Sequence, residues 1–223
     1  SKAAITPDSL WRIYSMTKAV TGVSLMMLYE EGRFQLNDPV SKYLPEFANM
    51  RVAVDKIDPA TLKRVYYTVP AERQITVRDL LRHTCGIDYA GPNDENGKSI
   101  YAQMGVRDAN IDLAEAVRRL ARAPLVHQPG TTYHYGLGID IAGRLVEVLS
   151  GKPLDQFFEE RVFKPLAMVD TAFQVPQEKW DRLVTLYAPG DQPGTLKKST
   201  APAQDSFRKK PNLLYGGAGL VST

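Results

Sequence analysis

Cysteine is almost absent from this chain of 223 residues, because Cys85 is the only one. A single cysteine forms no disulfide framework and no cysteine-based metal site. The three histidines, His83, His127 and His134, lack the H-x-x-x-H spacing that is typical of zinc ligands. The sequence therefore predicts neither disulfide stapling nor a zinc centre.

Long hydrophobic runs and an excess of charge of one sign are also missing. No stretch approaches the length of a membrane span, and the formal net charge is only +3. The basic residues at 197–198 and 208–210 have no interleaved aromatics, so they indicate a solvated loop rather than a nucleic-acid surface. We expect no membrane span and no nucleic-acid partner. The N-terminus shows no charged-then-apolar signal segment, which leaves cytoplasmic and periplasmic locations both open.

Helical patterns dominate what is present. They run from Ser15 to the stop signal Gly32, then over 75–82, 112–123, 139–149 and 154–162, with a short surface helix at 40–45. Thr76 and Asp112 are candidate caps, and Gly151 is a candidate stop. Residues 46–75 and 88–108, and the region after 176, contain many turn formers and predict largely irregular structure.

The first helix opens with Ser15-Met16-Thr17-Lys18. Residues three apart share one helix face, so the hydroxyl and the amine point into one cleft, where the amine helps to deprotonate the serine. The alternative is an N-cap serine beside a solvated lysine. A second S-x-x-K, Ser206 to Lys209, lies among prolines, and we interpret it as coincidental.

A nucleophile also needs a group that carries its proton to the leaving group. Tyr135 lies between a glycine turn and the apolar 139–149 helix, and a phenol acts as a base only beside positive charge, which Lys18 supplies. His134 is the alternative, since Ser–His–Asp sites are common. No G-x-S-x-G elbow occurs in the sequence, which argues against an α/β-hydrolase.

Several segments, in order and over nearly the whole chain, resemble the serine β-lactamase and penicillin-binding superfamily, in particular its class C-like branch. They are Ser15–Gly22, Leu80–Ile87 (similar to L-L-x-H-T-S-G-L), Pro129–Leu137, Phe163–Met168 and Gly216–Thr223 (similar to G-G-G-G-L-V-S-T). The resemblance implies an α+β fold of the serine β-lactamase/DD-peptidase type. It assigns Ser15, Lys18 and Tyr135 to catalysis and implies no metal or organic cofactor.

One departure from the family pattern separates substrate classes. The usual Tyr-x-Asn has Leu137 in place of the asparagine, so the contact with a substrate amide is lost at a cost of about 1–3 kcal/mol. An ester depends less on that contact, and the Tyr-x-Leu form resembles family VIII carboxylesterases. We therefore take Leu137 as a substrate-binding position. Cys85, in place of the usual serine, and His83 are interpreted as structural.

Residues 1–223 correspond to a partial β-lactamase-like domain, mainly its helical part. Most of the family's antiparallel sheet, including one oxyanion-hole strand, is missing from it. We expect a longer polypeptide or a second chain to supply the rest, and the sheet-facing surface to be poorly buried. The predicted function is hydrolysis of short-chain carboxylic esters through an acyl-enzyme, with Lys18 and Tyr135 sharing the role of base. The alternatives are a β-lactamase or D-alanyl-D-alanine carboxypeptidase, and a non-catalytic binding protein of the same fold.

Overall fold

The computed structural model describes residues 4–94, 96–201 and 205–223. A 3-10 turn, Tyr14–Met16, leads into α1 (Thr17–Glu30). The other α-helices are α2 (Val77–Leu81), α3 (Ile100–Gln103), α4 (Leu113–Arg122), α5 (Gly138–Ser150) and α6 (Leu154–Phe158), which continues as a π turn over Glu159–Phe163. Further 3-10 turns lie at Val40–Lys42, Pro45–Phe47, Gln177–Arg182 and Ser206–Arg208.

In the described residues the strands form small antiparallel pairs. They are β1 (Trp11–Arg12) with β6 (Val221–Ser222), β2 (Arg51–Ile57) with β3 (Arg64–Pro70), and β4 (Tyr187–Pro189) with β5 (Leu196–Lys198). The β1–β6 pair brings the C-terminal residues of the chain beside the segment that precedes Ser15. Helices beside small antiparallel sheets make this an α+β fold, as predicted.

Local capping chemistry accounts for three of the predicted helices. Thr76 caps α2 in a capping box with Asp79, and Asp112 caps α4 by accepting from the Glu115 amide at 2.7 Å. Gly151 ends α5 with a φ of 71°, in the left-handed region that favours glycine. These helix boundaries are confirmed to within two residues.

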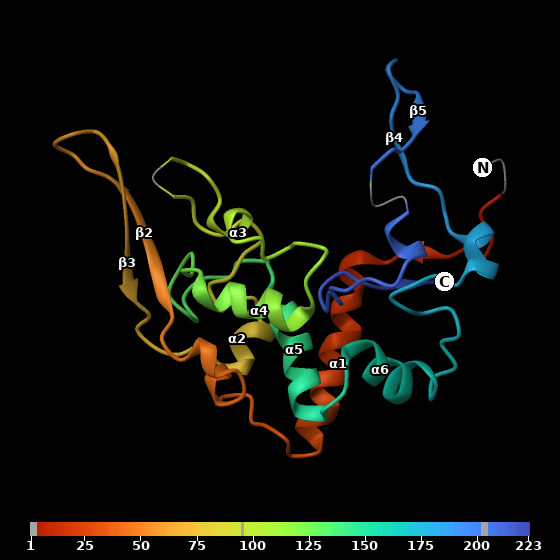
Figure 1. Cartoon of the computed structure of the whole chain (residues 1–223), viewed down its shortest axis with the longest axis horizontal. Coiled ribbons are helices and arrows are strands. Elements are labelled where there is room, and N and C mark those ends of the chain that lie inside the picture. Colours follow the sequence, from red (N-terminus) through yellow and green to blue (C-terminus); the bar gives the residue numbers. More distant parts are fainter. Residues whose placement is uncertain (1–3, 95, 202–204) are drawn as a thin grey trace.

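The longest helix, α1, packs along α5 near the middle of the molecule (Figure 1). Its buried face carries Thr17, Thr21, Ser24, Leu25 and Leu28. The expected apolar run is wrong in part, because Val23 is 54% exposed. The face is polar because its hydroxyls hold the glycine-rich segment 216–220: Thr21 Oγ1 donates to the Gly216 carbonyl at 2.6 Å, and the Leu220 amide donates to Thr17 Oγ1 at 3.1 Å.

Residues 46–75 were expected to be largely irregular, and this prediction is wrong. They contain the β2–β3 hairpin, paired from Arg51↔Pro70 to Ile57↔Arg64, which projects from the helices (Figure 1). Pro59 lies in the turn and Pro70 at a strand end, where proline does not interrupt pairing. The irregular regions 88–108 and 176 onward likewise contain α3 and the β4–β5 pair.

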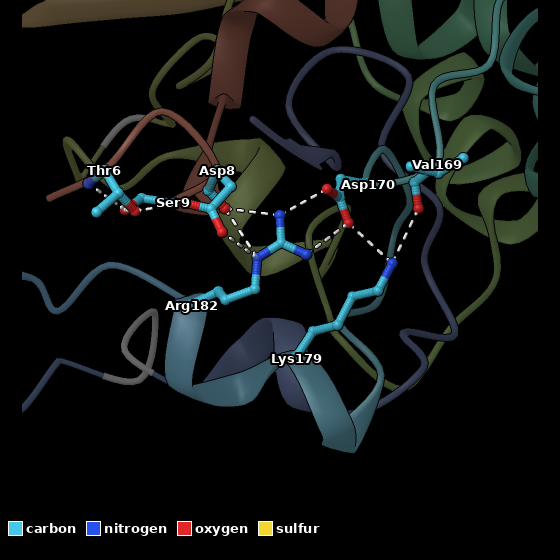
Figure 2. A network of polar contacts seen from close by, with 7 residues as sticks. All are labelled: Thr6, Asp8, Ser9, Val169, Asp170, Lys179 and Arg182. Carbon is cyan, nitrogen blue, oxygen red and sulfur yellow. Dashed lines mark hydrogen bonds and ion pairs between the residues drawn. The ribbon is translucent and has the colours of Figure 1, made fainter.

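A polar network fixes the N-terminal segment to residues 169–182 (Figure 2). Arg182 donates to both carboxylate oxygens of Asp170, at 3.0 and 2.6 Å, and to the carbonyl of Asp8. Lys179 also donates to Asp170, at 2.8 Å. The network joins segments more than 150 residues apart and anchors the approach to β1.

Large apolar side chains around the start of α1 are open to solvent. Exposed fractions lie between 41% and 69% for Trp11, Tyr14, Met16 and Val23. The expectation of a poorly buried sheet-facing surface stays a prediction. Among the described residues, no helix is both long enough and apolar enough to cross a membrane.

Candidate active site

Ser15 and Lys18 lie at the junction between the 3-10 turn and α1. Ser15 is exposed, and the ammonium of the half-buried Lys18 donates to its Oγ at 3.2 Å. Met16 is the N-cap of α1, and no side chain caps this end, so the alternative of a capping Ser15 is wrong. Tyr14, directly before the serine, has a φ of 42°, a strained conformation of the kind that gathers at functional sites.

Several acceptors surround the Lys18 ammonium. Besides Ser15, it donates to the Tyr89 hydroxyl at 3.2 Å and to the Gly217 carbonyl at 2.7 Å. Burial acts to lower the pKa of Lys18, but hydrogen bonds with Tyr135 and Tyr89 more than offset it, so this pKa is raised. Lys18 is therefore a cation at neutral pH.

Tyr135 lies beside this cation, with its ring centroid 4.7 Å from Lys18 Nζ. Its pKa is lowered, first by the hydrogen bond with Lys18 and next by the one with Ser15. The structure thus brings Ser15, Lys18 and Tyr135 together, as the sequence predicts. Of the three side chains, the phenol is the one whose environment favours the deprotonated form.

His83 holds the loop that carries Tyr135. Its Nδ1 accepts from the Gly136 amide at 3.3 Å, its carbonyl accepts from the His134 amide at 2.8 Å, and its ring lies 4.7 Å from that of Tyr135. Burial, aided by Lys18, lowers the pKa of His83. This geometry suits the predicted role in fixing the loop. The ring of the alternative base, His134, lies tilted against that of His127, with the ring centroids 5.4 Å apart.

Two further predicted positions, Leu137 and Cys85, are buried. Leu137, the N-cap residue of α5, is 3% exposed and belongs to the hydrophobic core, so its contact with substrate stays a prediction. Cys85 is buried, which raises the pKa of its thiol to about 12 and agrees with a structural role. The second S-x-x-K begins in a short 3-10 turn, Ser206–Arg208, in which Phe207 and Arg208 are half-buried.

Sequence reasoning missed Tyr89 and left Gly217 without a role. Tyr89 falls in a segment rich in turn formers, and its position two residues after the Leu80–Ile87 motif is the one sequence signal that could have indicated it. Tyr89 also lines a pocket of about 400 Å³, together with Tyr101, Val106 and Arg107. No group of three or more His, Cys, Asp or Glu side chains that could hold a metal occurs in the described part of the chain.

Comparison with known proteins gives consistent matches. The Beta-lactamase family model matches residues 1–223. Protein Rv1367c of Mycobacterium tuberculosis is 35% identical over 97% of this chain and 51% of its own length. Esterase EstB of Burkholderia gladioli is 33% identical over 74% of this chain and 39% of its own length. The solved structure of EstCE1, described as a hydrolase with promiscuous acyltransferase activity, matches with a TM-score of 0.75 at 27% identity, covering 99% of this chain and 57% of that one. The chain thus spans about half the length of these relatives.

Proposed function

This chain belongs to the beta-lactamase family, and on that premise we propose that it is a serine hydrolase that cleaves short-chain carboxylic esters through an acyl-enzyme. The observation that carries the proposal is the Lys18 ammonium, which lies within hydrogen-bond distance of Ser15 Oγ and lowers the pKa of Tyr135. The esterase relative EstB supports the ester class.

In the proposed reaction, Ser15 Oγ attacks the ester carbonyl and its proton passes to the Tyr135 oxygen. Lys18 stays protonated and stabilises the phenolate, which refines the shared-base prediction into a tyrosine base beside a lysine charge. The tetrahedral intermediate then breaks its bond to the alcohol, which takes the proton from Tyr135. Water then attacks the acyl-serine and loses a proton to Tyr135. Tyr135 returns this proton to Ser15 Oγ as the carboxylic acid leaves.

The choice of esters over lactams rests on Leu137. The isobutyl group of Leu137 forms no hydrogen bond with a substrate amide. Leu137 is buried, and it stands where the family pattern has an asparagine. The pocket bordered by Tyr89 and Arg107 is the candidate site for part of the substrate. The description of EstCE1 includes a promiscuous acyltransferase activity, and for this chain acyl transfer to an alcohol would use the same acyl-enzyme and differ only in the second nucleophile.

A fluorophosphonate probe followed by peptide mass spectrometry tests the nucleophile. We expect label on Ser15 and none in Ser15→Ala, with Ser206→Ala as the matched control that labels normally. Tyr135→Phe is expected to slow hydrolysis of p-nitrophenyl butyrate by about 10²- to 10⁴-fold. Faster turnover of nitrocefin than of the ester would favour the lactamase alternative, and absence of label would favour a binding protein.

A further inference from the structure

Asp140 is a buried carboxylate next to the site. It lies in the first turn of α5 and is 5% exposed. Its Oδ1 accepts from the Gly217 amide at 3.0 Å, a contact between segments 77 residues apart. In the part of the chain that the structure describes, no cation lies within ion-pair distance of this carboxylate. An acid in such a place needs a reason, because an unpaired buried carboxylate is costly.

Gly217 connects Asp140 to the nucleophile. The same residue whose amide donates to Asp140 offers its carbonyl to Lys18 Nζ at 2.7 Å, a shorter distance than those from Lys18 Nζ to Ser15 and Tyr89. The neighbouring Gly216 carbonyl is fixed by Thr21 of α1. A Cβ on Gly217 would lie 2.8 Å from Asp140 Oδ2, so only glycine permits this approach.

The charges that face Asp140 belong to the site. Burial raises its pKa to about 6, although the cations Lys18 and Arg107 act against the shift. Among the described residues, Tyr215 also interacts with Asp140: burial is the main cause that raises the pKa of Tyr215, and the Asp140 carboxylate acts in the same direction. Above this pKa, the carboxylate adds negative charge next to the glycine that holds the Lys18 ammonium.

We propose that Asp140 is a positioning residue of the acylation site: through Gly217 it holds the Lys18 ammonium in place between Ser15 and Tyr89. The inference rests on the proposed serine chemistry. Without the oxygen acceptor at position 140, the Gly217 carbonyl is free to turn away from Lys18. The ammonium then loses its alignment, and displacements of about 1 Å at a reacting centre cost about 10²-fold in rate.

The test compares Asp140→Ala with Asp140→Asn. We expect Asp140→Ala to lower both the rate of Ser15 labelling and kcat on p-nitrophenyl butyrate by about 10²-fold, with KM little changed. Asparagine keeps an oxygen acceptor for the Gly217 amide, so we expect Asp140→Asn to recover to within about fivefold of wild type at pH 8. Because asparagine resembles the protonated acid, the step in labelling rate near pH 6 that Asp140 gives the wild type is absent from this variant, whereas the decline due to protonation of Tyr135 remains in both.

Asp79→Asn is the matched control, since Asp79 is equally buried and does not contact Lys18 or Gly217. It is expected to lower stability and to leave the pH profile of the folded protein unchanged. Wild-type protein that takes no label contradicts the proposed function. Normal labelling of a folded Asp140→Ala overturns only the role of Asp140, as does an Asp140→Asn that is as slow as Asp140→Ala. If Asp140→Ala fails to fold by circular dichroism, the pH profile of Asp140→Asn decides.

Discussion

Asp79 and Asp140 lie in the first turns of α2 and α5, two helices that pack together, and each is 5% exposed. Their surroundings are opposite. Asp79 accepts two hydrogen bonds from Arg73, at 2.6 and 2.9 Å, and further bonds from Thr76 and Thr84. Asp140 accepts from the Gly217 amide, and its nearest cations act only through space.

The same burial therefore gives opposite titration behaviour. For Asp79, burial acts to raise the pKa, but the hydrogen bonds from Arg73 and Thr76 outweigh it and the pKa is lowered. For Asp140, burial prevails and the pKa rises to about 6. Burial alone thus does not set the charge of a carboxylate; the donors around it do. Asp79 stabilises the start of α2, whereas Asp140 carries a charge near Lys18 that changes with pH around 6.

The largest expected effect comes from removing Lys18, the cation that Asp140 is proposed to position. Lys18→Met should slow labelling of Ser15 by about 10³-fold or more, because Tyr135 loses the charge that lowers its pKa. The arrangement around Asp79 should be untouched, with the unfolding transition still cooperative. The exposed Lys164→Met is the control and should label at the wild-type rate. Equal rates for both variants would contradict the assignment of Lys18.

Removing Arg73, the ion-pair partner of Asp79, leaves Asp79 in surroundings like those of Asp140. Arg73→Met leaves the Asp79 carboxylate buried without its ion-pair partner, and we expect a loss of about 2 kcal/mol in unfolding free energy. The cost is below that of a fully buried pair because 44% of the Arg73 side chain is exposed. Urea unfolding at pH 7 measures it, with the exposed Arg78→Met as control. A change as small as that of the control would mean that the Arg73 pair contributes little to the fold.

The two acids should also give pH dependences of opposite sign. The folded-state pKa of Asp140, about 6, exceeds the ordinary value of 3.8, so its contribution to stability is present at low pH and lost as pH rises through 6. Relative to Asp140→Asn, the free energy of unfolding of the wild type should fall by about 2 kcal/mol between pH 4 and pH 7. The lowered pKa of Asp79 gives the reverse, a contribution present above 3.8 and lost as pH falls. Urea unfolding of the wild type, Asp140→Asn and Asp79→Asn from about pH 3 to about pH 7 measures both contributions, and parallel pH curves for the two variants would contradict the comparison.

What the sequence predicted well depends on contacts within a few residues. The helix starting after Thr76, the one starting after Asp112 and the stop at Gly151 follow from capping groups that lie beside the backbone they satisfy. Ser15 and Lys18 share a helix turn, so their approach was predictable too. The hairpin over 51–70 was missed because its prolines were given more weight than its β-branched and aromatic residues.

What the sequence did not predict depends on distant partners. The buried face of α1 is polar because Thr21 bonds to a carbonyl 195 residues away. Tyr89 reaches Lys18 across 71 residues, and Asp140 reaches Gly217 across 77. Helical periodicity ranks residues by hydrophobicity and gives no information on which polar group will meet another after folding.

The smallest expected effects come from two threonines, one near each acid. Thr76 caps α2 beside Asp79, whereas Thr21 bonds to the segment that connects Asp140 with Lys18. Thr76→Ala and Thr21→Val should each cost about 1 kcal/mol in urea unfolding, the first as a lost cap and the second as a buried carbonyl left without a donor. Only Thr21→Val should also slow labelling of Ser15, by about tenfold, because it loosens Gly216 and with it the carbonyl on Lys18. Equal labelling rates in the two variants would show that the Thr21 contact stabilises the glycine-rich segment without acting on the site, as the Thr76 cap does for α2.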